Sequence, residues 1–210
     1  MKERPILFSA PMVRAILDGR KTQTRRIVKP QPEPFVTKFF VNEHGCGISE
    51  DEAQNHVWRC PYGIPGDRLW VRECWTPDHR DFYPHFPAVY KADAAYNYDR
   101  NEKGEVYSPE QKSWYPYRWR PSIHMPRWAS RITLEVVAVR VERLQDITEH
   151  DAELEGAAMC EHFADAKRGH PLQPHKTAFA WLWNKINGVD SWAANPWVWV
   201  VEFKRLEQPK

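Results

Sequence analysis

Residues 18–26 read Asp18-Gly19-Arg20-Lys21-Thr22-Gln23-Thr24-Arg25-Arg26, and the organisation of the chain can be worked out from this stretch. Residues 5–9 before it are typical of a short buried strand. After Pro11, which is well suited to the first turn of a helix, apolar side chains recur at helical spacing at Met12, Val13, Ile16 and Leu17. Gly19 ends this helix, because glycine readily takes the left-handed conformation found at helix C-termini. The residues that follow are therefore predicted to form a basic loop at the end of a rigid helix.

The predicted loop concentrates charge in a chain that carries little net charge. Four cations and two threonines lie within nine residues, whereas the 210-residue chain has 30 Lys and Arg against 28 Asp and Glu, a formal net charge of +2. This balance excludes a polycation that binds nucleic acid over its whole surface, so any such affinity must come from a local patch. A lone basic loop is usually a solvated turn, so a functional role needs further support.

The remaining regular elements follow from hydrophobic patterning. Strands are predicted at 69–73, 131–144 and 197–203, and the apolar phase of the second strand shifts near Val136, which predicts a β-bulge. Thr148 is expected to cap a short helix. A second helix is predicted from about Thr177 to Asn187, and its core face is formed by Phe179, Leu182, Trp183 and Ile186.

Two long stretches, at about 27–62 and 75–130, lack regular periodicity and are predicted to be irregular insertions. The second is rich in aromatic residues and proline, which argues against disorder. Its aromatics alternate with arginines, as in Arg118, Trp119 and Arg127. Such a pattern suits either a nucleic-acid platform or simple packing over the core, and the sequence favours neither. The fold class expected is α+β, a single domain over 1–210 with a small bent sheet or barrel and flanking helices.

Composition also bears on the compartment and on metals. The N-terminal apolar run is too short for a signal peptide, and no run is long enough to cross a membrane, so a cytoplasmic protein is expected. The four cysteines show no CxxC pairing. A zinc site at His44, Cys46, His56 and Cys60 is the alternative, but its spacing lacks the tight pairs of structural zinc sites. No metal and no cofactor are predicted.

The stretch at Gly19 resembles the G-x-K-x-x-T-x-R signature of ASCH domains, which are PUA-like barrels associated with RNA. Three further segments resemble that family in the same order, namely the Gly66-Asp67 turn into a strand, residues 144–156 and the closing strand at 200–204. Residues 119–132 look like the longer phage and prophage members. The resemblance covers about half of the chain and implies a PUA-like β-barrel, the two insertions accounting for most of the rest.

Within this superfamily, small bacterial acetylcytidine amidohydrolases use a Lys, a Thr and a Glu. The resemblance assigns Lys21 as the proton acceptor, Thr24 as the nucleophile and Glu155 as the acid, with Glu153 as the alternative acid. Such chemistry is reasonable, because a threonine hydroxyl needs an adjacent base to attack an amide. Burial and neighbouring cations would lower the pKa of Lys21, so that it could act as this base. The cations expected to lower the pKa, and also to bind substrate, are Arg20, Arg25 and Arg26.

The sequence thus predicts a protein that recognises a modified nucleoside or RNA, with single-stranded nucleic acid as a possible partner. The leading function is an amidohydrolase that removes an acyl group from the exocyclic amine of cytidine. Neither a membrane nor an obligate protein partner is expected. Two alternatives stay open: a non-catalytic RNA- or DNA-binding module that only grips phosphate, and a ribonuclease.

Overall fold

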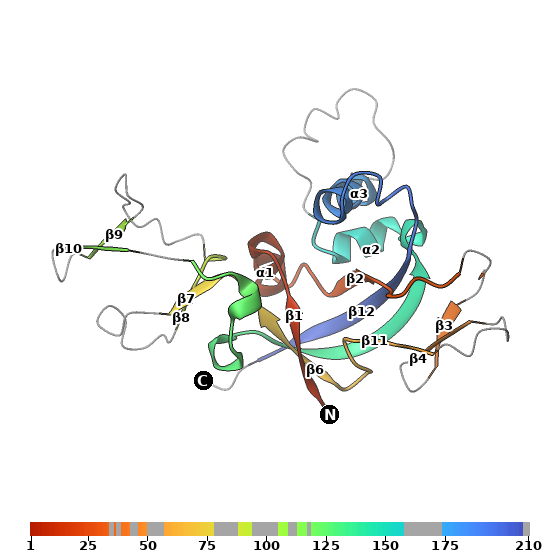
Figure 1. The fold of residues 1–210 in the computed structure, drawn as a ribbon, viewed down its shortest axis with the longest axis horizontal. Helices are drawn as coiled ribbons and strands as arrows, with labels where there is room; N and C mark the ends of the chain where they lie inside the picture. The colour runs from red at the N-terminus through yellow and green to blue at the C-terminus, as the bar shows by residue number, and fades with distance from the viewer. Residues whose placement is uncertain are drawn as a thin grey trace, which may run out of the picture.

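A five-stranded mixed sheet forms the centre of the molecule (Figure 1). The computed structural model describes residues 1–33, 36, 39–42, 46–49, 57–77, 88–93, 105–108, 113–116, 119–157 and 174–207. In spatial order the strands are β1 (Glu3–Leu7), β6 (Arg68–Arg72), β11 (Thr133–Arg143), β12 (Trp197–Leu206) and β2 (Gln23–Ile27). The β1–β6 pair is parallel, and the other pairs are antiparallel.

The sheet is open, so the predicted small β-barrel is not formed by the described residues. The strand order places β1 and β2 at opposite edges, and no ladder joins them in the described ranges. The long β11 and β12 curve strongly, as Figure 1 shows. A register shift between Val136 and Ala138 confirms the predicted bulge. One side chain spans the gap between the edges, since Arg26 Nη2 donates to the Leu7 carbonyl at 2.7 Å. The α+β class is confirmed, but backbone closure is replaced here by this side-chain contact.

Within the described ranges, three helices accompany the sheet, namely α1 (Ala10–Leu17), α2 (Glu149–Leu154) and α3 (Pro174–Asn187). Helix α1 is followed by Gly19 at φ +75°, as its sequence predicts. Thr148 caps α2, where its Oγ1 accepts from Asp151 N at 3.0 Å. Helix α3 begins three residues earlier than predicted. In Figure 1, α2 and α3 lie together on one side of the sheet. None of the helices in the described ranges has both the length and the apolar content needed to cross a membrane.

The two stretches predicted to be irregular contain short paired strands. The first holds a small sheet of β3 (Phe39–Val41), β4 (Cys46–Ser49) and β5 (Trp58–Arg59). The second holds two hairpins, which are β7 (Trp75–Pro77) with β8 (Ala88–Tyr90), and β9 (Glu105–Ser108) with β10 (Ser113–Pro116). Three single 3-10 turns complete the elements: η1 (Ser122–His124), η2 (Arg127–Ala129) and η3 (Leu144–Asp146). The strands are too short for a period of two to show in the sequence.

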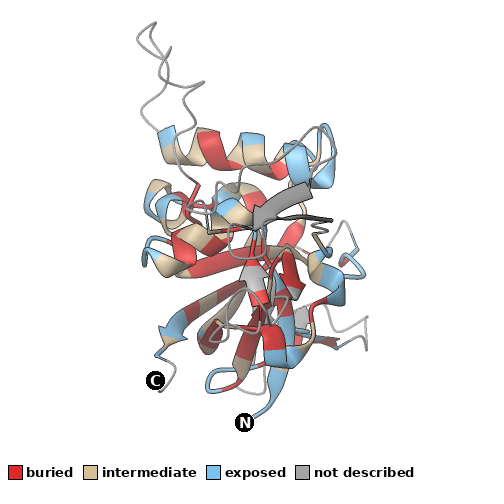
Figure 2. Cartoon of the chain, turned by 90° about the vertical axis from the view of Figure 1, so that its left-hand side faces the viewer, coloured by how far each residue is buried: buried red, intermediate tan, exposed pale blue. Residues whose placement is uncertain are grey.

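Strand β12 is buried on both faces, which explains its nearly continuous apolar sequence. Trp199 and Val201 pack into the core that includes α1, whereas Val198 and Val200 pack against α2 and α3. Figure 2 shows buried residues as red bands through the centre of the sheet. The predicted core face of α3 is only partly correct, because Ile186 is 65% exposed. Its side chain lies instead at a cleft between α3 and β2.

Candidate active site

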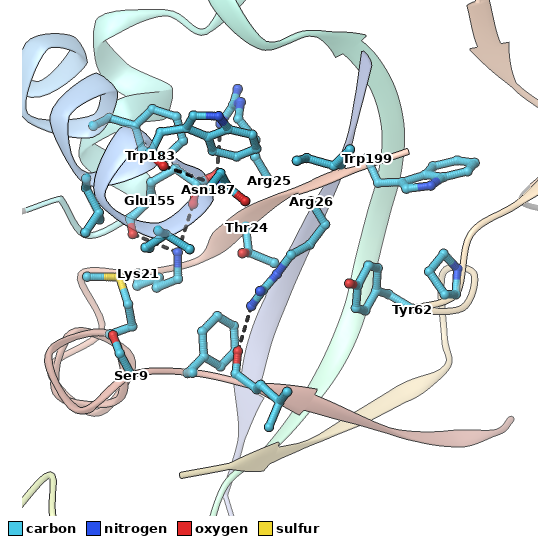
Figure 3. Close-up of a pocket in the computed structure, with 18 of the residues that line it drawn as sticks. Ser9, Lys21, Thr24, Arg25, Arg26, Tyr62, Glu155, Trp183, Asn187 and Trp199 are labelled. Atoms are coloured by element: carbon cyan, nitrogen blue, oxygen red, sulfur yellow. Dashed lines mark hydrogen bonds and ion pairs between the residues drawn. The ribbon is translucent and has the colours of Figure 1, made fainter. Parts of the chain in front are cut away.

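A cleft of about 750 Å³ opens where β2, α1 and α3 meet. Its polar side holds residues from the stretch after Gly19 and from the end of α2, namely Lys21, Thr24, Arg25, Arg26 and Glu155. Helix α3 contributes an apolar wall of Phe179, Leu182, Trp183 and Ile186. Tyr62 and Trp199 line the cleft farther along β2, on the opposite side from Lys21 and Glu155 (Figure 3).

The chain turns sharply between α1 and β2, and this turn delivers Lys21 to the cleft. The amides of Arg20 and Lys21 both donate to the Ala15 carbonyl, at 2.8 and 3.0 Å. Thr22 N then donates to the Leu154 carbonyl at 3.0 Å, which ties the turn to the end of α2. From Gln23 onward the chain is β2, paired with β12. The predicted loop therefore ends at Thr22, and Thr24, Arg25 and Arg26 are held on a strand.

Lys21 and Glu155 form a buried ion pair at the base of the cleft. Lys21 Nζ donates to Glu155 Oε2 at 2.9 Å, to the Glu155 carbonyl at 2.7 Å and to the Gln23 carbonyl at 2.8 Å. The exposed fractions of the two side chains are 1% and 4%. Burial lowers the pKa of Lys21, the Glu155 carboxylate opposes this shift, and Arg26 and Arg25 add to the lowering. Three acceptors for three ammonium protons mean that Lys21 is protonated in this arrangement.

Arg25 holds the other oxygen of the same carboxylate. Its Nη1 donates to Glu155 Oε1 at 3.0 Å, and its side chain is fully buried. Behind it lie two more carboxylates, because Arg25 also pairs with Glu142 and, at 3.4 Å, with Asp151. Gln23 Nε2 donates to Asp151 Oδ1 at 3.0 Å, and Arg140 forms ion pairs with the carboxylates of Glu142 and Asp151. Arg25 thus holds Glu155 in place, and the positive charge of Arg25 is already compensated by three carboxylates of the protein.

The end of α2 approaches Lys21 closely because residue 156 is glycine. Gly156 has φ +72°, and a Cβ there would lie 2.9 Å from Ala15 Cβ and 3.0 Å from Lys21 Cβ. Both distances are below ordinary van der Waals contact, so a side chain would separate α2 from the turn. Glu153, the alternative acid, is 61% exposed and lies 3.7 Å from His150. The structure therefore places Glu155, and not Glu153, beside Lys21.

Thr24 points into the cleft between Lys21 and Arg26, as Figure 3 shows. It is 4% exposed, and its hydroxyl makes no hydrogen bond to the described part of the chain. Phe8 lies beneath the two cations, with Lys21 Nζ at 5.5 Å and the Arg26 guanidinium at 5.3 Å from its ring centroid. The two contacts hold the cations on either side of the hydroxyl, where an oxyanion could be stabilised.

Other predicted site residues lie away from this cleft. Arg20 is 52% exposed and pairs with Asp18 at 2.8 Å, so it is not among the cations that affect Lys21. Arg127 pairs with Glu3 at 3.0 Å and is absent from the cleft lining. Trp119 is half-buried and also lies outside the lining. Arg118 falls outside the described residues. The predicted binding set therefore separates into Arg25 and Arg26 in the cleft and the others elsewhere.

Several cleft residues were not predicted as site residues. The α3 side chains were assigned to the core, and Asn187 was read only as a helix end. Tyr62 and Trp199 had no local signal at all, because they enter the cleft only through the pairing of distant strands. In α3 one sequence feature could have indicated the cleft: the apolar stripe continues past the buried Trp183 to Ile186 in the last turn.

The alternative zinc site lies only partly within the described residues. His44 and His56 fall outside the described residues, and the buried Cys60 has a pKa raised by burial to about 11, which favours its thiol form. Among the residues that are described, no group of three or more His, Cys, Asp or Glu is arranged to hold a metal ion.

The protein-family models, the curated proteins and the solved structures provide no match to this chain.

Proposed function

We propose that this protein is an ASCH-type amidohydrolase that removes an acyl group from the exocyclic amine of cytidine, free or within RNA. The observation that supports this most strongly is the Lys21–Glu155 contact of 2.9 Å, in the same cleft as the Thr24 hydroxyl. A nucleophile, a base and a carboxylate are the three groups that cleavage of an amide requires.

The proposed reaction begins when Lys21, after losing a proton, accepts the proton of the Thr24 hydroxyl. Thr24 Oγ1 attacks the acyl carbon, and the negative charge on the acyl oxygen is stabilised by Arg26. Glu155 relays the proton from Lys21 Nζ to the exocyclic nitrogen as the carbon–nitrogen bond breaks, which releases cytidine. Water then hydrolyses the acyl-threonine ester and restores the free hydroxyl.

Burial supports the role of Lys21 as a base. A lysine in water is almost fully protonated at neutral pH, but desolvation and the positive charges of Arg25 and Arg26 lower its pKa here. A substrate that displaces water from the cleft would strengthen this effect. The apolar wall of α3, which includes Phe179 and Trp183, suits the flat face of a pyrimidine.

One observation favours a second candidate, a binding module without catalysis. Lys21 uses all three of its ammonium protons on protein acceptors, and its side chain is 1% exposed. A lysine held in this way can serve purely to keep Glu155 and the end of α2 in place. In that case the cleft would still bind a base, but no bond would break.

The test is to incubate the pure protein with cytidine carrying an acetyl group on its exocyclic amine, and with a panel of other acylated nucleosides. Chromatography then measures free cytidine, and a parallel titration measures binding of an unacylated oligonucleotide over a range of salt. The proposal predicts catalytic release of cytidine. Binding that weakens steeply with salt, without any release, identifies the binding module. Labelled RNA in the same incubation reports ribonuclease activity directly.

A further inference from the structure

The cleft carries more positive charge than the proposed chemistry uses. Its lining includes five cations, of which Lys21 and Arg25 are paired with Glu155, and that glutamate is the sole carboxylate among the described residues of the lining. Arg26, Lys29 and Arg59 make up the remainder. The cleft thus carries a local excess of positive charge in a chain with a formal net charge of only +2.

These three cations lack carboxylate partners in the described part of the chain. Lys29 and Arg59 are exposed, and no ion pair joins either of them to a described residue. Arg26 binds the Leu7 carbonyl through Nη2 and forms no ion pair with a described residue. The contrast with Arg25, which pairs with three carboxylates, shows that the fold neutralises one arginine of β2 and leaves the next available.

Two of these cations, Lys29 and Arg59, lie toward the end of the cleft away from Lys21. Lys29 lies two residues beyond the end of β2 and five positions beyond Thr24, which corresponds to roughly 16 Å of extended chain. Arg59 ends β5 and is close in sequence to Tyr62, which Figure 3 places across the cleft from Lys21 and Glu155. A nucleotide with its exocyclic amine at Thr24 would therefore extend its ribose and phosphate past Arg26 toward these side chains.

We infer that Lys29 and Arg59 form a phosphate subsite beyond Arg26, so that the ligand is a phosphorylated cytidine rather than the free nucleoside. This inference rests on the proposed function for the orientation of the base, but the subsite itself requires only binding. The phosphate can belong to a free nucleotide or to a phosphodiester of single-stranded RNA, since both present the same oxygens to the same cations.

The experiment compares cytidine, cytidine 5′-monophosphate and a short oligocytidylate by calorimetric titration at low salt. None of these ligands carries an acyl group, so the result is independent of whether the protein deacetylates anything. The monophosphate is expected to bind at least about tenfold more tightly than cytidine, and the gain should shrink as salt is added. If the oligocytidylate binds more tightly than the monophosphate, RNA is the source of the phosphate. If the oligocytidylate and the monophosphate bind with equal affinity, the ligand is the free nucleotide.

The double variant Lys29→Gln, Arg59→Gln is expected to remove most of this gain. Its matched control is Lys91→Gln, Arg205→Gln, which deletes the same charges at exposed positions outside the cleft lining and should keep the gain. The inference is overturned if cytidine and its monophosphate bind with equal affinity, if neither binds, or if both double variants lose the gain equally. Absence of deacetylation with the tenfold gain intact would remove the proposed reaction and leave the phosphate subsite standing.

Discussion

Lys21 Nζ lies 2.9 Å from Glu155 Oε2, although 134 positions separate the two residues in the sequence. Three local features produce this contact. Gly19 turns the chain back after α1, the Thr22 amide binds the end of α2, and Gly156 has no side chain to keep the two segments apart. The Lys21–Glu155 pair is therefore also a structural contact, which links the turn after α1 to the end of α2.

Replacing Lys21 by methionine should destabilise the protein by about 3 kcal/mol or more, because breaking a buried pair leaves one charge poorly compensated. Urea unfolding measures the loss. Arg20→Met is the matched control, since Arg20 is exposed, and it should change stability by no more than about 0.5 kcal/mol. In the double variant Lys21→Met, Glu155→Gln the losses should be less than additive. If Lys21→Met and Arg20→Met lowered the free energy of unfolding equally, the Lys21–Glu155 pair would not contribute to stability.

The two glutamates at the end of α2 give a second matched pair. Glu155→Gln removes the proposed proton relay and should lower kcat for deacetylation by about 100-fold or more. Glu153→Gln alters an exposed side chain and should leave kcat within about twofold of the unaltered protein. Steady-state kinetics with acetylated cytidine decides between them. A larger loss for Glu153→Gln would transfer the acid role to that residue.

Gly156→Ala should damage the site through geometry alone. The added Cβ would meet Ala15 and Lys21 at 2.9 and 3.0 Å, and an L-residue at φ +72° costs about 1 kcal/mol in addition. Gly19→Ala carries a similar penalty at φ +75° but meets nothing within 4 Å. Both variants should lose stability in thermal unfolding, with the greater loss for Gly156→Ala, and Gly156→Ala alone should lose activity. Identical activity in the two variants would contradict the close approach.

The deacetylation rate should rise with pH, with the sign set by Lys21. Burial lowers the pKa of Lys21 from its ordinary 10.5, so the neutral base accumulates at a lower pH than it would in water. Between the lowered pKa and 10.5 the unfolded chain holds more protons at this residue, and stability from this group therefore also rises with pH in that window. A profile of kcat/KM should level off below pH 10.5. Lys21→Arg, which stays protonated, should show no such rise.

The three helices and four of the five strands of the central sheet could be predicted because their signals are local. Gly19 at a helix end, Thr148 at a helix start and the phase shift near Val136 each act within one turn or a few strand positions. Strand β2 was missed because its charged residues resemble a solvated loop. Arg25 is buried only because carboxylates from β11 and α2 surround it, and no local pattern contains that information.

The residues of the candidate site were also predictable only in part. Lys21, Thr24 and Glu155 could be named from the motif and its resemblance, and the structure brings them into one cleft. The barrel was expected from the same resemblance, yet β1 and β2 remain separate edges. Arg20 was expected to act with its neighbours, but it follows Gly19 on the outside of the turn and pairs with Asp18 instead.

The most direct test of the proposed mechanism is the release of cytidine from acetylated cytidine by the unaltered protein, by Thr24→Ser and by Thr24→Val. Serine keeps the hydroxyl, and valine keeps the shape of threonine while removing it. The account predicts many turnovers for the unaltered protein, measurable turnover for Thr24→Ser, and a loss of about 10³-fold or more for Thr24→Val with unfolding unchanged to within about 1.5 kcal/mol. Equal release of cytidine by the unaltered protein and by Thr24→Val would contradict it.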